Sequence, residues 1–360
     1  MKILILANND VGLYQFRREL IGELLKKNTV IISLPYGELV QPLVDMGCKF
    51  INTPIDRRGV NPKTDLKLYF QYKKILKAEK PNLVITYTIK PDVYGGYACR
   101  KLGIPYAENI TGLGSGFQNS GLLRRIVTIM YKGGLKKAKV VFFENKENRQ
   151  VFVQEGIVSD KKTCLLNGAG VNLEHYQVAE YPDGDMIKFL FIGRVMKEKG
   201  IDELFDAMRQ LQQEGINCSL DVLGDYEEDY KIKIEQYETE GWLHYHGYQK
   251  DVRPYIEACH CFVLPSWHEG MANSNLECAA CGRPVITSNI HGCLESVEDG
   301  VSGYLCEKQN AKDLYRVMKK FVKLSYEKRK AMGIAGRNRM ETVFDKKKIV
   351  QATIKQLNKC

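Results

Sequence analysis

Short apolar segments alternate with amphipathic segments along the sequence, and this alternation restricts the chain to folds in which helices join parallel strands. The apolar segments are rich in β-branched residues, which predicts strands, and most precede a stretch with helical periodicity, as in 11–27, 65–79 and 92–102. This pattern is typical of a doubly wound parallel α/β sheet. The strands predicted in the first half are Lys2–Ala7, Val30–Leu34, Lys49–Thr53, Leu83–Tyr87, Ile104–Asn109, Val140–Glu144 and Thr163–Leu166.

The second half repeats the alternation after a turn-rich segment at residues 181–185, where we place the domain boundary. The predicted strands are Ile187–Ile192, Ser219–Leu223, Leu243–His246, Cys261–Leu264, Pro284–Thr287 and Tyr304–Cys306. The predicted helices are Gly200–Gln213, Glu227–Glu240, Val252–Ala258, Ser274–Cys281, Ala311–Leu324 and Tyr326–Val343.

A chain of 360 residues is longer than one hydrophobic core usually supports. We therefore expect a Rossmann-like domain over residues 1–180 and a second one over residues 181–343, facing each other across a cleft. A helix over residues 344–360 is expected to pack back on the first domain.

The apolar runs are too short for a membrane span, and the run at residues 1–7 is too short for a secretory signal, so we expect a cytoplasmic protein. Eleven cysteines, an odd number, are scattered through predicted strands and helices, as expected of reduced thiols. Cys278 and Cys281, with Cys259-His260-Cys261 upstream, have a spacing that zinc also uses. Buried small residues are the interpretation that we favour, and no metal site is predicted.

The positive charge is confined to the first half. Residues 1–180 carry 27 Lys and Arg against 16 Asp and Glu, whereas the remaining residues carry 26 against 27. A basic half predicts a polyanionic partner, either a nucleic acid or an anionic membrane surface. Because the sequence has no helix-turn-helix, zinc finger or RNA-binding signature, we expect no nucleic acid.

Loops after the predicted strands of the first half are candidates for binding, because ligands of parallel sheets lie at the carboxyl ends of the strands. The loop at residues 8–17 opens a helix with one glycine, Gly12, but it lacks the GxGxxG and GKS or GKT motifs. The loop at residues 110–117 has glycines at alternate positions, and Lys90 follows another strand. Each feature is also compatible with an ordinary loop or a solvated lysine.

Two segments of the second half favour a diphosphate site. The segment 262–277 is predicted as a strand, a polar loop and a helix start, which together offer backbone N–H groups and the positive end of a helix dipole. Glu269 and Glu277 flank that helix start, and a carboxylate suits the vicinal hydroxyls of a ribose or a sugar. Arg194 and Lys199 follow the first strand of this half, where two cations can stabilise a departing diphosphate.

These residues resemble a known family over the whole chain. Their order and spacing are similar to those of the retaining nucleotide-sugar glycosyltransferases of family 4, which have the GT-B fold of two Rossmann-like domains. In the first half, three motifs resemble the branch that includes bacterial undecaprenyl-diphosphate-linked N-acetylgalactosaminyltransferases. The motifs shared with the family are Gly193-Arg194 with Lys199-Gly200, Glu269-x7-Glu277, residues 246–252, and Gly292 with Glu295, Gly300 and Gly303. The three motifs shared with the branch are Tyr14-x-Phe16-Arg17, Lys90-Pro91 and Gly112-Leu113-Gly114.

The resemblance implies a retaining transfer of a hexose or N-acetylhexosamine from a UDP-sugar to a lipid-linked glycan, without metal or other cofactor. It implies catalytic roles for Glu269, Arg194 and Lys199. Donor contacts are implied for Gly12, Gly193, Val252, Gly270, Met271, Ala272, Asn273, Ser274, Asn275 and Glu277, and acceptor contacts for Tyr14, Arg17, Lys90, Asn109, Thr111 and Gly112.

Two departures leave the transferred sugar open. Many relatives have proline soon after the glycine that follows the first glutamate, where this chain has Met271-Ala272-Asn273. Many also have histidine after a strand of the first domain, where this chain has Asn109 and Thr111. A soluble acceptor and a sugar-binding protein without catalysis remain alternatives, although the second should have lost one of the four charged residues.

The basic half contains a segment that predicts contact with anionic lipid. Residues 122–139 combine apolar residues at helical spacing with six cations, the composition of an interfacial helix. We therefore expect a protein that lies peripherally on the inner face of the cell membrane. The alternative is an ordinary core-packing helix with a solvated face, and Gly133-Gly134 is expected to break either helix. The cations are Arg124, Arg125, Lys132, Lys136, Lys137 and Lys139.

Overall fold

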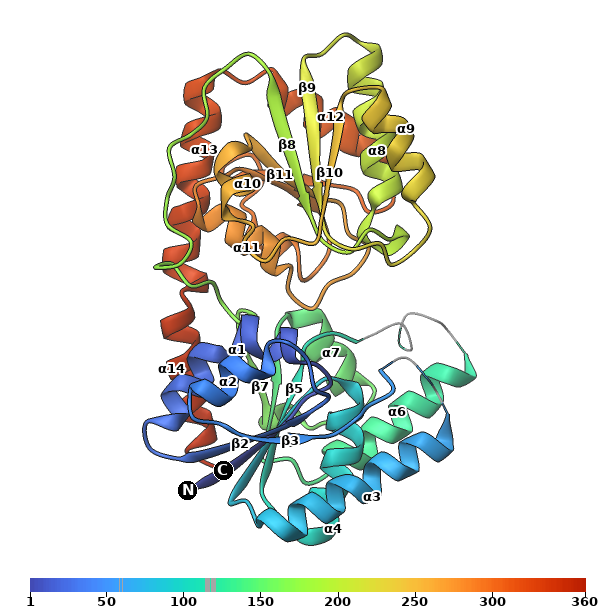
Figure 1. Ribbon diagram of the computed structural model, residues 1–360, viewed down its shortest axis with the longest axis vertical. Helices are drawn as coiled ribbons and strands as arrows, with labels where there is room; N and C mark the ends of the chain where they lie inside the picture. Colours follow the sequence, from blue (N-terminus) through green and yellow to red (C-terminus); the bar gives the residue numbers. More distant parts are fainter. Residues whose placement is uncertain (58, 60, 114–116, 118–120) are drawn as a thin grey trace. The chain divides into compact units, whose positions relative to one another are not determined.

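A computed structural model of the protein describes residues 1–57, 59, 61–113, 117 and 121–360, which divide into two compact units (Figure 1). The N-terminal unit contains residues 1–169 and 346–360, and the C-terminal unit contains residues 170–345. The division lies before the boundary predicted at residues 180 and 181, because the intervening segment packs on the C-terminal unit. There, the Val171 N–H donates to Phe344 O at 2.8 Å, and the Tyr181 hydroxyl donates to His260 O at 2.8 Å.

In the described part of the N-terminal unit, seven parallel strands form one sheet in the order β3-β2-β1-β4-β5-β6-β7. The strands contain buried apolar runs such as Leu4-Ile5-Leu6, which suit a sheet covered on both faces. They are β1 (Lys2–Leu6), β2 (Thr29–Leu34), β3 (Lys49–Asn52), β4 (Leu83–Tyr87), β5 (Tyr106–Ile110), β6 (Val140–Phe143) and β7 (Thr163–Leu165).

Asparagine side chains begin several helices of this unit. Asn9, Asn61 and Asn145 each accept a hydrogen bond from an N–H of the first turn, which satisfies a donor that the helix leaves free. The helices are α1 (Asp10–Leu25), α2 (Val40–Asp45), α3 (Pro62–Glu79), a π-helical turn η1 (Pro91–Gly95), α4 (Gly96–Leu102), α6 (Leu122–Leu135), α7 (Lys146–Gln154) and a 3-10 turn η2 (Asp160–Lys162).

The helix α6 continues through Gly133 and Gly134, so the predicted break is wrong. A Cβ atom at Gly133 would lie 1.6 Å from the Tyr97 hydroxyl, and one at Gly134 would lie 3.0 Å from backbone atoms of Asp92 and Val93. The two glycines therefore allow α6 to pack closely on η1 and α4, and this tertiary packing outweighs their low helix propensity.

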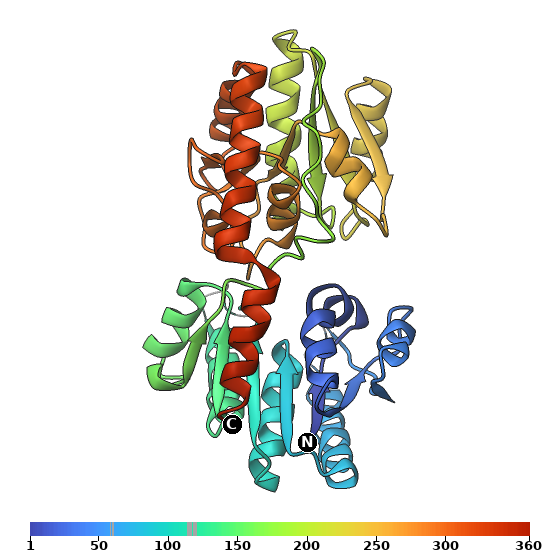
Figure 2. The same ribbon diagram turned by 90° about the vertical axis from the view of Figure 1, so that its left-hand side faces the viewer.

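The helix α14 (Lys346–Leu357) belongs to the N-terminal unit, where it packs on α1 (Figure 2). Its Val350 and Leu357 join the apolar core on that face of the sheet, and its buried Lys346 pairs with Glu19 at 3.4 Å. Residues far apart in the sequence thus complete one domain.

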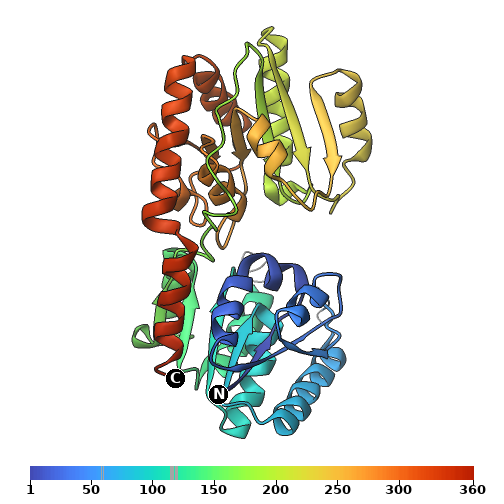
Figure 3. The same cartoon turned by 60° about the vertical axis from the view of Figure 1, so that its left-hand side comes forward.

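The C-terminal unit has a second parallel sheet with helices on both faces (Figure 3). Within it, α8 packs with α12, and α11 packs with α13. The sheet has the order β10-β9-β8-β11-β12-β13, with β8 (Ile187–Ile192), β9 (Cys218–Leu223), β10 (Leu243–Gly247), β11 (Cys261–Leu264), β12 (Val285–Ser288) and β13 (Gly303–Cys306). The helices are η3 (Lys197–Lys199), α8 (Ile201–Gln213), α9 (Lys231–Thr239), α10 (Arg253–Ala258), α11 (Asn273–Ala280), η4 (Leu294–Ser296), α12 (Ala311–Val322), α13 (Tyr326–Arg339) and η5 (Met340–Phe344).

Candidate functional site

The strand order of the C-terminal sheet reverses between β8 and β11, which are neighbours in the sheet but not in the sequence. In open parallel sheets such a switch point leaves a crevice at the carboxyl ends of the strands. Gly193–Gly200 follows β8 and residues 265–272 follow β11, so the two segments singled out in the sequence meet at this edge.

Close backbone contacts hold these two loops together. Gly200 has φ +73°, and a Cβ atom there would lie 2.1 Å from Pro265 O, so only glycine fits. The Trp267 N–H donates to Glu198 O at 2.9 Å, and the Ser266 hydroxyl donates to the same oxygen at 3.2 Å. The turn after β8 is therefore fixed relative to the loop after β11.

Lys199 and Glu269 form an ion pair across the two loops, in which Lys199 Nζ donates to Glu269 Oε1. Their side chains are 19% and 13% exposed, so the pair is largely shielded from water but still reachable. The structure thus brings together two of the three predicted catalytic residues.

A third loop, which follows β12, contacts the backbone of Glu269 and Ala272. A Cβ atom at Gly292 would lie 2.5 Å from Glu269 O, and the Ala272 N–H donates to Gly292 O at 2.7 Å. The Glu295 carboxylate in turn accepts the Gly292 N–H at 2.7 Å. This chain of contacts explains why the glycine and the glutamate occur together in the sequence, and it gives both a structural role.

The helix α11 begins directly after the loop that follows β11, with Ala272 as its N-cap. Asn273 and Ser274 are half-buried in its first turn, where backbone N–H groups have no partner within the helix. The N–H of Asn275 donates to Ala272 O, and its buried amide donates to Thr287 and Ser296. Asn275 therefore anchors the helix within the unit, and its contact with the donor stays a prediction.

Glu277 lies one turn inside α11, half-buried beside Tyr176. Burial and the neighbouring Glu277 carboxylate, which accepts the Tyr176 hydroxyl, raise the pKa of Tyr176. Tyr176 lies about a hundred residues upstream in the sequence and carried no motif, so sequence reasoning missed it.

Arg194 is the most exposed of the predicted catalytic residues, with a side chain that is 53% exposed. Its guanidinium lies 3.4 Å from Glu227, which follows β9. The preceding residue, Gly193, donates its N–H to Leu223 O at 2.9 Å, and its own carbonyl would lie 2.0 Å from a Cβ at Gly224. Arg194 thus has a fixed backbone and an exposed side chain with one long contact to Glu227.

The remaining donor residues of this unit lie around the same loops. Gly270 is half-buried, whereas Met271 is buried and joins the apolar core with Ala272. Val252 is the N-cap of α10 and accepts the Ile256 N–H at 3.0 Å, so its carbonyl is used by the helix.

His268, which sequence analysis passed over, lies beside Glu269. Its Nε2 is 3.3 Å from Glu198 Oε2, and burial lowers the pKa of the ring. Its position directly before Glu269 in the sequence is the signal that could have identified His268.

In the N-terminal unit the sheet order reverses between β1 and β4. Gly12 and Tyr14 follow β1 on α1. The Gly12 N–H donates to the Asn9 side chain at 2.6 Å and so caps the start of α1, and the contact of Gly12 with the donor stays a prediction. Tyr14 is half-buried against the Arg18 guanidinium, 5.5 Å from its ring centre.

Arg17 is held in a buried ion pair. Its guanidinium lies 2.5 Å from Glu144 Oε1 and 5.0 Å from the centre of the Tyr87 ring, and the paired side chains are 11% and 10% exposed. Burial raises the pKa of Glu144 more than Arg17 lowers it. The pair joins α1 to the end of β6. The predicted contact of Arg17 with the acceptor must therefore form while Arg17 is also paired with Glu144.

Lys90 is similarly engaged, with Nζ donating to Asp65 Oδ1 and to Gly59 O, each at 2.7 Å. Asn109 is buried, and its amide donates to Thr86 O at 3.0 Å, so its contact with the acceptor stays a prediction. Thr111 and Gly112 follow β5 and are half-buried. The other glycines of this predicted loop, Gly114 and Gly116, lie outside the described residues.

Thr88 is a further residue that the sequence did not reveal. It follows β4 with φ +75°, a conformation that a β-branched residue rarely adopts, and its carbonyl accepts the Asp92 N–H at 2.9 Å. Such strain often occurs at functional sites.

The cysteine interpretation can be tested directly. Cys259, Cys261, Cys278 and Cys281 are buried free thiols whose pKa values are raised by burial, which does not suit a thiolate ligand. Across the described ranges, no cluster of His, Cys, Asp and Glu is arranged to hold a metal ion.

Two family models match the sequence. Residues 176–339 match glycosyl transferases group 1, and residues 2–145 match the glycosyl transferase 4-like family. The chain combines a glycosyl transferase 4-like domain with a group 1 glycosyltransferase domain. The predicted family is thereby confirmed, and the loop pair at β8 and β11 lies within the first matched region of this glycosyltransferase.

Relatives of this glycosyltransferase act on undecaprenol-linked substrates. It is 28% identical over 87% of both chains to the N,N'-diacetylbacillosaminyl-diphospho-undecaprenol alpha-1,3-N-acetylgalactosaminyltransferase of Campylobacter jejuni. It is 26% identical, over 69% of this chain and 68% of the other, to the UDP-Gal:alpha-D-GlcNAc-diphosphoundecaprenol alpha-1,3-galactosyltransferase of Escherichia coli.

The fold of this glycosyltransferase matches solved structures. HepE of Anabaena, in complex with UDP and glucose, is similar over the full length of both chains, with a TM-score of 0.83 at 19% identity. The predicted GT-B fold is confirmed. None of the helices in the described ranges has the length and apolar character needed to span a membrane.

Proposed function

We propose that this glycosyltransferase transfers a hexose or N-acetylhexosamine from a UDP-sugar to an undecaprenyl-diphosphate-linked glycan, with retention of anomeric configuration. The observation that carries the proposal is the Lys199–Glu269 pair beside the N-terminus of α11, at the β8–β11 switch point.

The donor diphosphate binds Lys199, Arg194 and the N–H groups of Asn273 and Ser274. A lysine is a point charge that suits phosphate oxygens, and the start of α11 adds the positive end of the helix dipole. Arg194 is held only weakly by Glu227, so its guanidinium can turn to a phosphate. Glu277 binds the ribose hydroxyls, with Tyr176 orienting the carboxylate.

Glu269 binds hydroxyls of the transferred sugar. The bond between the anomeric carbon and the phosphate oxygen breaks, and the acceptor oxygen forms its new bond on the same face of the sugar. The acceptor proton passes to the departing phosphate oxygen, so no strong protein base is required. Lys199 and Arg194 stabilise the charge that develops on the diphosphate, which makes a metal ion or other cofactor unnecessary.

The two bacterial relatives, whose names specify diphospho-undecaprenol-linked substrates, support the proposal of a lipid-linked acceptor. The N-terminal unit carries the basic excess and an exposed apolar row on α6, which suit attachment to the inner membrane surface. In that row, Leu122, Ile126 and Ile129 are 74%, 45% and 66% exposed.

The donor is tested by thermal shift with UDP, GDP and ADP and with their sugars. A ligand that binds only the folded state stabilises it by mass action, so UDP and one UDP-sugar should raise Tm while the others leave it unchanged. Equal shifts with all three nucleotides would contradict the UDP assignment.

Transfer is then tested with that UDP-sugar and a short-chain polyprenyl-diphosphate glycan, and the anomeric configuration of the product is read by NMR. Retention, with full activity in EDTA, is expected. Donor binding without transfer to any lipid-linked acceptor would instead favour a binding protein or a soluble acceptor.

A further inference from the structure

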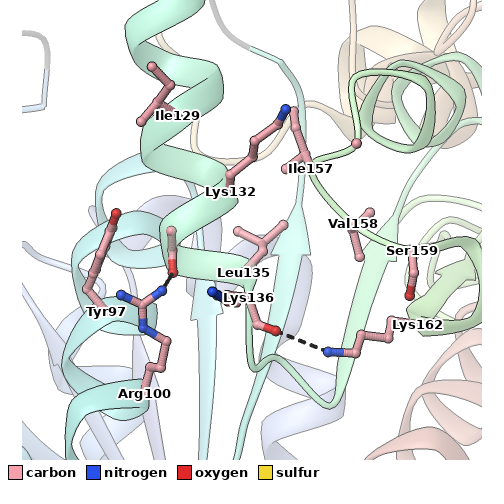
Figure 4. Close-up of a pocket in the computed structure, with 12 residues that line it drawn as sticks. Tyr97, Arg100, Ile129, Lys132, Leu135, Lys136, Ile157, Val158, Ser159 and Lys162 are labelled. Carbon is pink, nitrogen blue, oxygen red and sulfur yellow. Dashed lines mark hydrogen bonds between the residues drawn. The ribbon is translucent and has the colours of Figure 1, made fainter.

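A cavity of about 560 Å³ lies in the N-terminal unit between α4, the C-terminal end of α6 and the segment that precedes β7 (Figure 4). Its lining includes four cations, Arg100, Lys132, Lys136 and Lys162, and the apolar side chains Ile129 and Ile157.

The cavity lies at the opposite edge of the sheet from the predicted acceptor residues. The helix α6 follows β5 and precedes β6, and because these strands are parallel, it returns from the carboxyl edge to the amino edge. Arg100 and Lys162 also precede strands of this sheet. The cavity is therefore separate from the loops that follow β1, β4 and β5, where the predicted acceptor residues lie.

The lining carries four positive charges and includes no acidic side chain. Two acidic residues stand near it in the sequence, but both are paired with other arginines. Glu155 lies 2.8 Å from Arg124, and Asp160 lies 2.5 Å from Arg149. The cations of the cavity are therefore not neutralised by these carboxylates, which favours an anionic ligand.

Two of the cations are held in place by backbone carbonyls. Arg100 donates to Gly133 O at 2.6 Å with its guanidinium 4.6 Å from the centre of the Tyr97 ring, and Lys162 donates to Lys136 O at 3.2 Å. Figure 4 shows both bonds at the rim of the cavity. They also satisfy carbonyls at the end of α6, whose partial negative charge would otherwise oppose an anion. Each cation retains further N–H donors.

The apolar row on α6 leads to this cavity. Leu122, Ile126 and Ile129 are spaced by four and three residues, so they share one helix face, and Ile129 is both exposed and part of the lining. A ligand that fits this arrangement has a phosphate for the cations and hydrocarbon for the row.

We propose that this cavity binds the phosphodiester headgroup of an anionic phospholipid, with the acyl chains along Leu122, Ile126 and Ile129. The proposal rests on the membrane part of the proposed function and assigns it a discrete lipid site in place of diffuse charge attraction. The chemistry of the chain's own residues, cations beside an exposed apolar row, selects a lipid over a soluble phosphate.

The test compares two double variants that remove the same charge from the same unit. Lys132→Gln/Lys162→Gln alters the cavity, and Lys137→Gln/Lys139→Gln alters exposed lysines outside its lining. Co-sedimentation is measured with phosphatidylcholine vesicles that contain 30% or no phosphatidylglycerol. We expect the cavity variant to need about tenfold more anionic lipid for half-binding, and the control about twofold. Equal weakening would overturn the proposal in favour of diffuse attraction.

A second measurement distinguishes lipid from free phosphate. Short-chain phosphatidylglycerol below its micellar concentration should raise the Tm of the wild-type protein but not of the cavity variant, and sn-glycerol 3-phosphate should have little effect on either. Equal shifts with glycerol phosphate would remove the role of the apolar row and overturn the lipid assignment. Transfer to a soluble short-chain acceptor should be unchanged in the cavity variant, so a failed transferase proposal gives a different result from a failed lipid site.

Discussion

The two sheets share one strand order around their switch points, yet the edges at β8–β11 and β1–β4 differ in how they use charge. At the first edge, Lys199 and Glu269 lie beside a helix N-terminus, with the exposed Arg194 on the turn that leads to Lys199. At the second, Arg17 and Lys90 join separate elements of the unit to one another. The same topology can therefore place a charged pair beside a helix N-terminus or use its cations to join separate elements, depending on what the charged side chains contact.

The sharpest test of this difference is the removal of Lys199. We expect Lys199→Ala to lower kcat/KM at least about a hundredfold, because loss of one fixed cation at developing charge costs about 3 kcal/mol. Arg194→Ala should also lower turnover by roughly a hundredfold, for the same reason. Lys197→Ala is the control, since Lys197 is exposed on the same turn, and it should change the rate by less than about threefold. Normal rates in a folded Lys199 variant would remove the pair from the mechanism.

The corresponding change at the other edge should act on stability. Arg17→Met leaves Glu144 buried without its partner, which costs about 3 kcal/mol of unfolding free energy. Urea denaturation measures the loss, and Arg17→Met/Glu144→Met should recover much of it. If Arg17→Met unfolds like the wild type but loses acceptor affinity, the contrast between the two edges is wrong.

A buried carboxyl pair next to the structural edge gives a pH-dependent effect. Glu108 and Asp92 are fully buried, and in the described part neither oxygen of Glu108 has a hydrogen-bond partner. Burial, and then the neighbouring Asp92, raise the pKa of Glu108 well above its usual range. The folded state therefore retains a proton that the unfolded state releases above about pH 4.3.

It follows that the free energy of unfolding should fall as pH rises above that value, by up to about 1.4 kcal/mol per pH unit until the raised pKa is reached. Glu108→Gln should flatten this dependence in urea titrations between pH 5 and 8, whereas Glu23→Gln, on the exposed part of α1, should not. A variant as pH-dependent as the wild type would show that the carboxyl is ionised in the fold.

The smallest expected effect concerns Thr88. Replacing it with glycine relieves the strain at φ +75° and should stabilise the protein by about 1 kcal/mol. Lys80→Gly, at a left-handed helix C-cap in the same unit, should stabilise it similarly without changing acceptor KM. If the acceptor KM rises only in the Thr88 variant, the strained backbone at Thr88 contributes to acceptor binding. If the kinetics are unchanged in both variants, the strain has only a structural role.

The strands could be predicted well because apolar runs rich in β-branched residues, such as Val30–Leu34, are typical of strands in a sheet that is covered on both faces. Lys199 and Glu269 were also found, since each follows a strand at the switch point. The contacts of Arg17 and of Gly133 could not be predicted, because Glu144 and Tyr97 lie far away in the sequence. The helices α2 and α7 were not among the predicted helices.

The position of α14 bears on how the chain acquires its structure during synthesis. The N-terminal unit needs residues 346–360 to cover one face of its sheet, whereas residues 170–345 form a continuous unit. On the ribosome, the C-terminal unit can therefore complete its core while Val350 and Leu357 are still to be made. The unit that is translated first finishes folding last, with an apolar strip along α1 open to chaperones in the meantime.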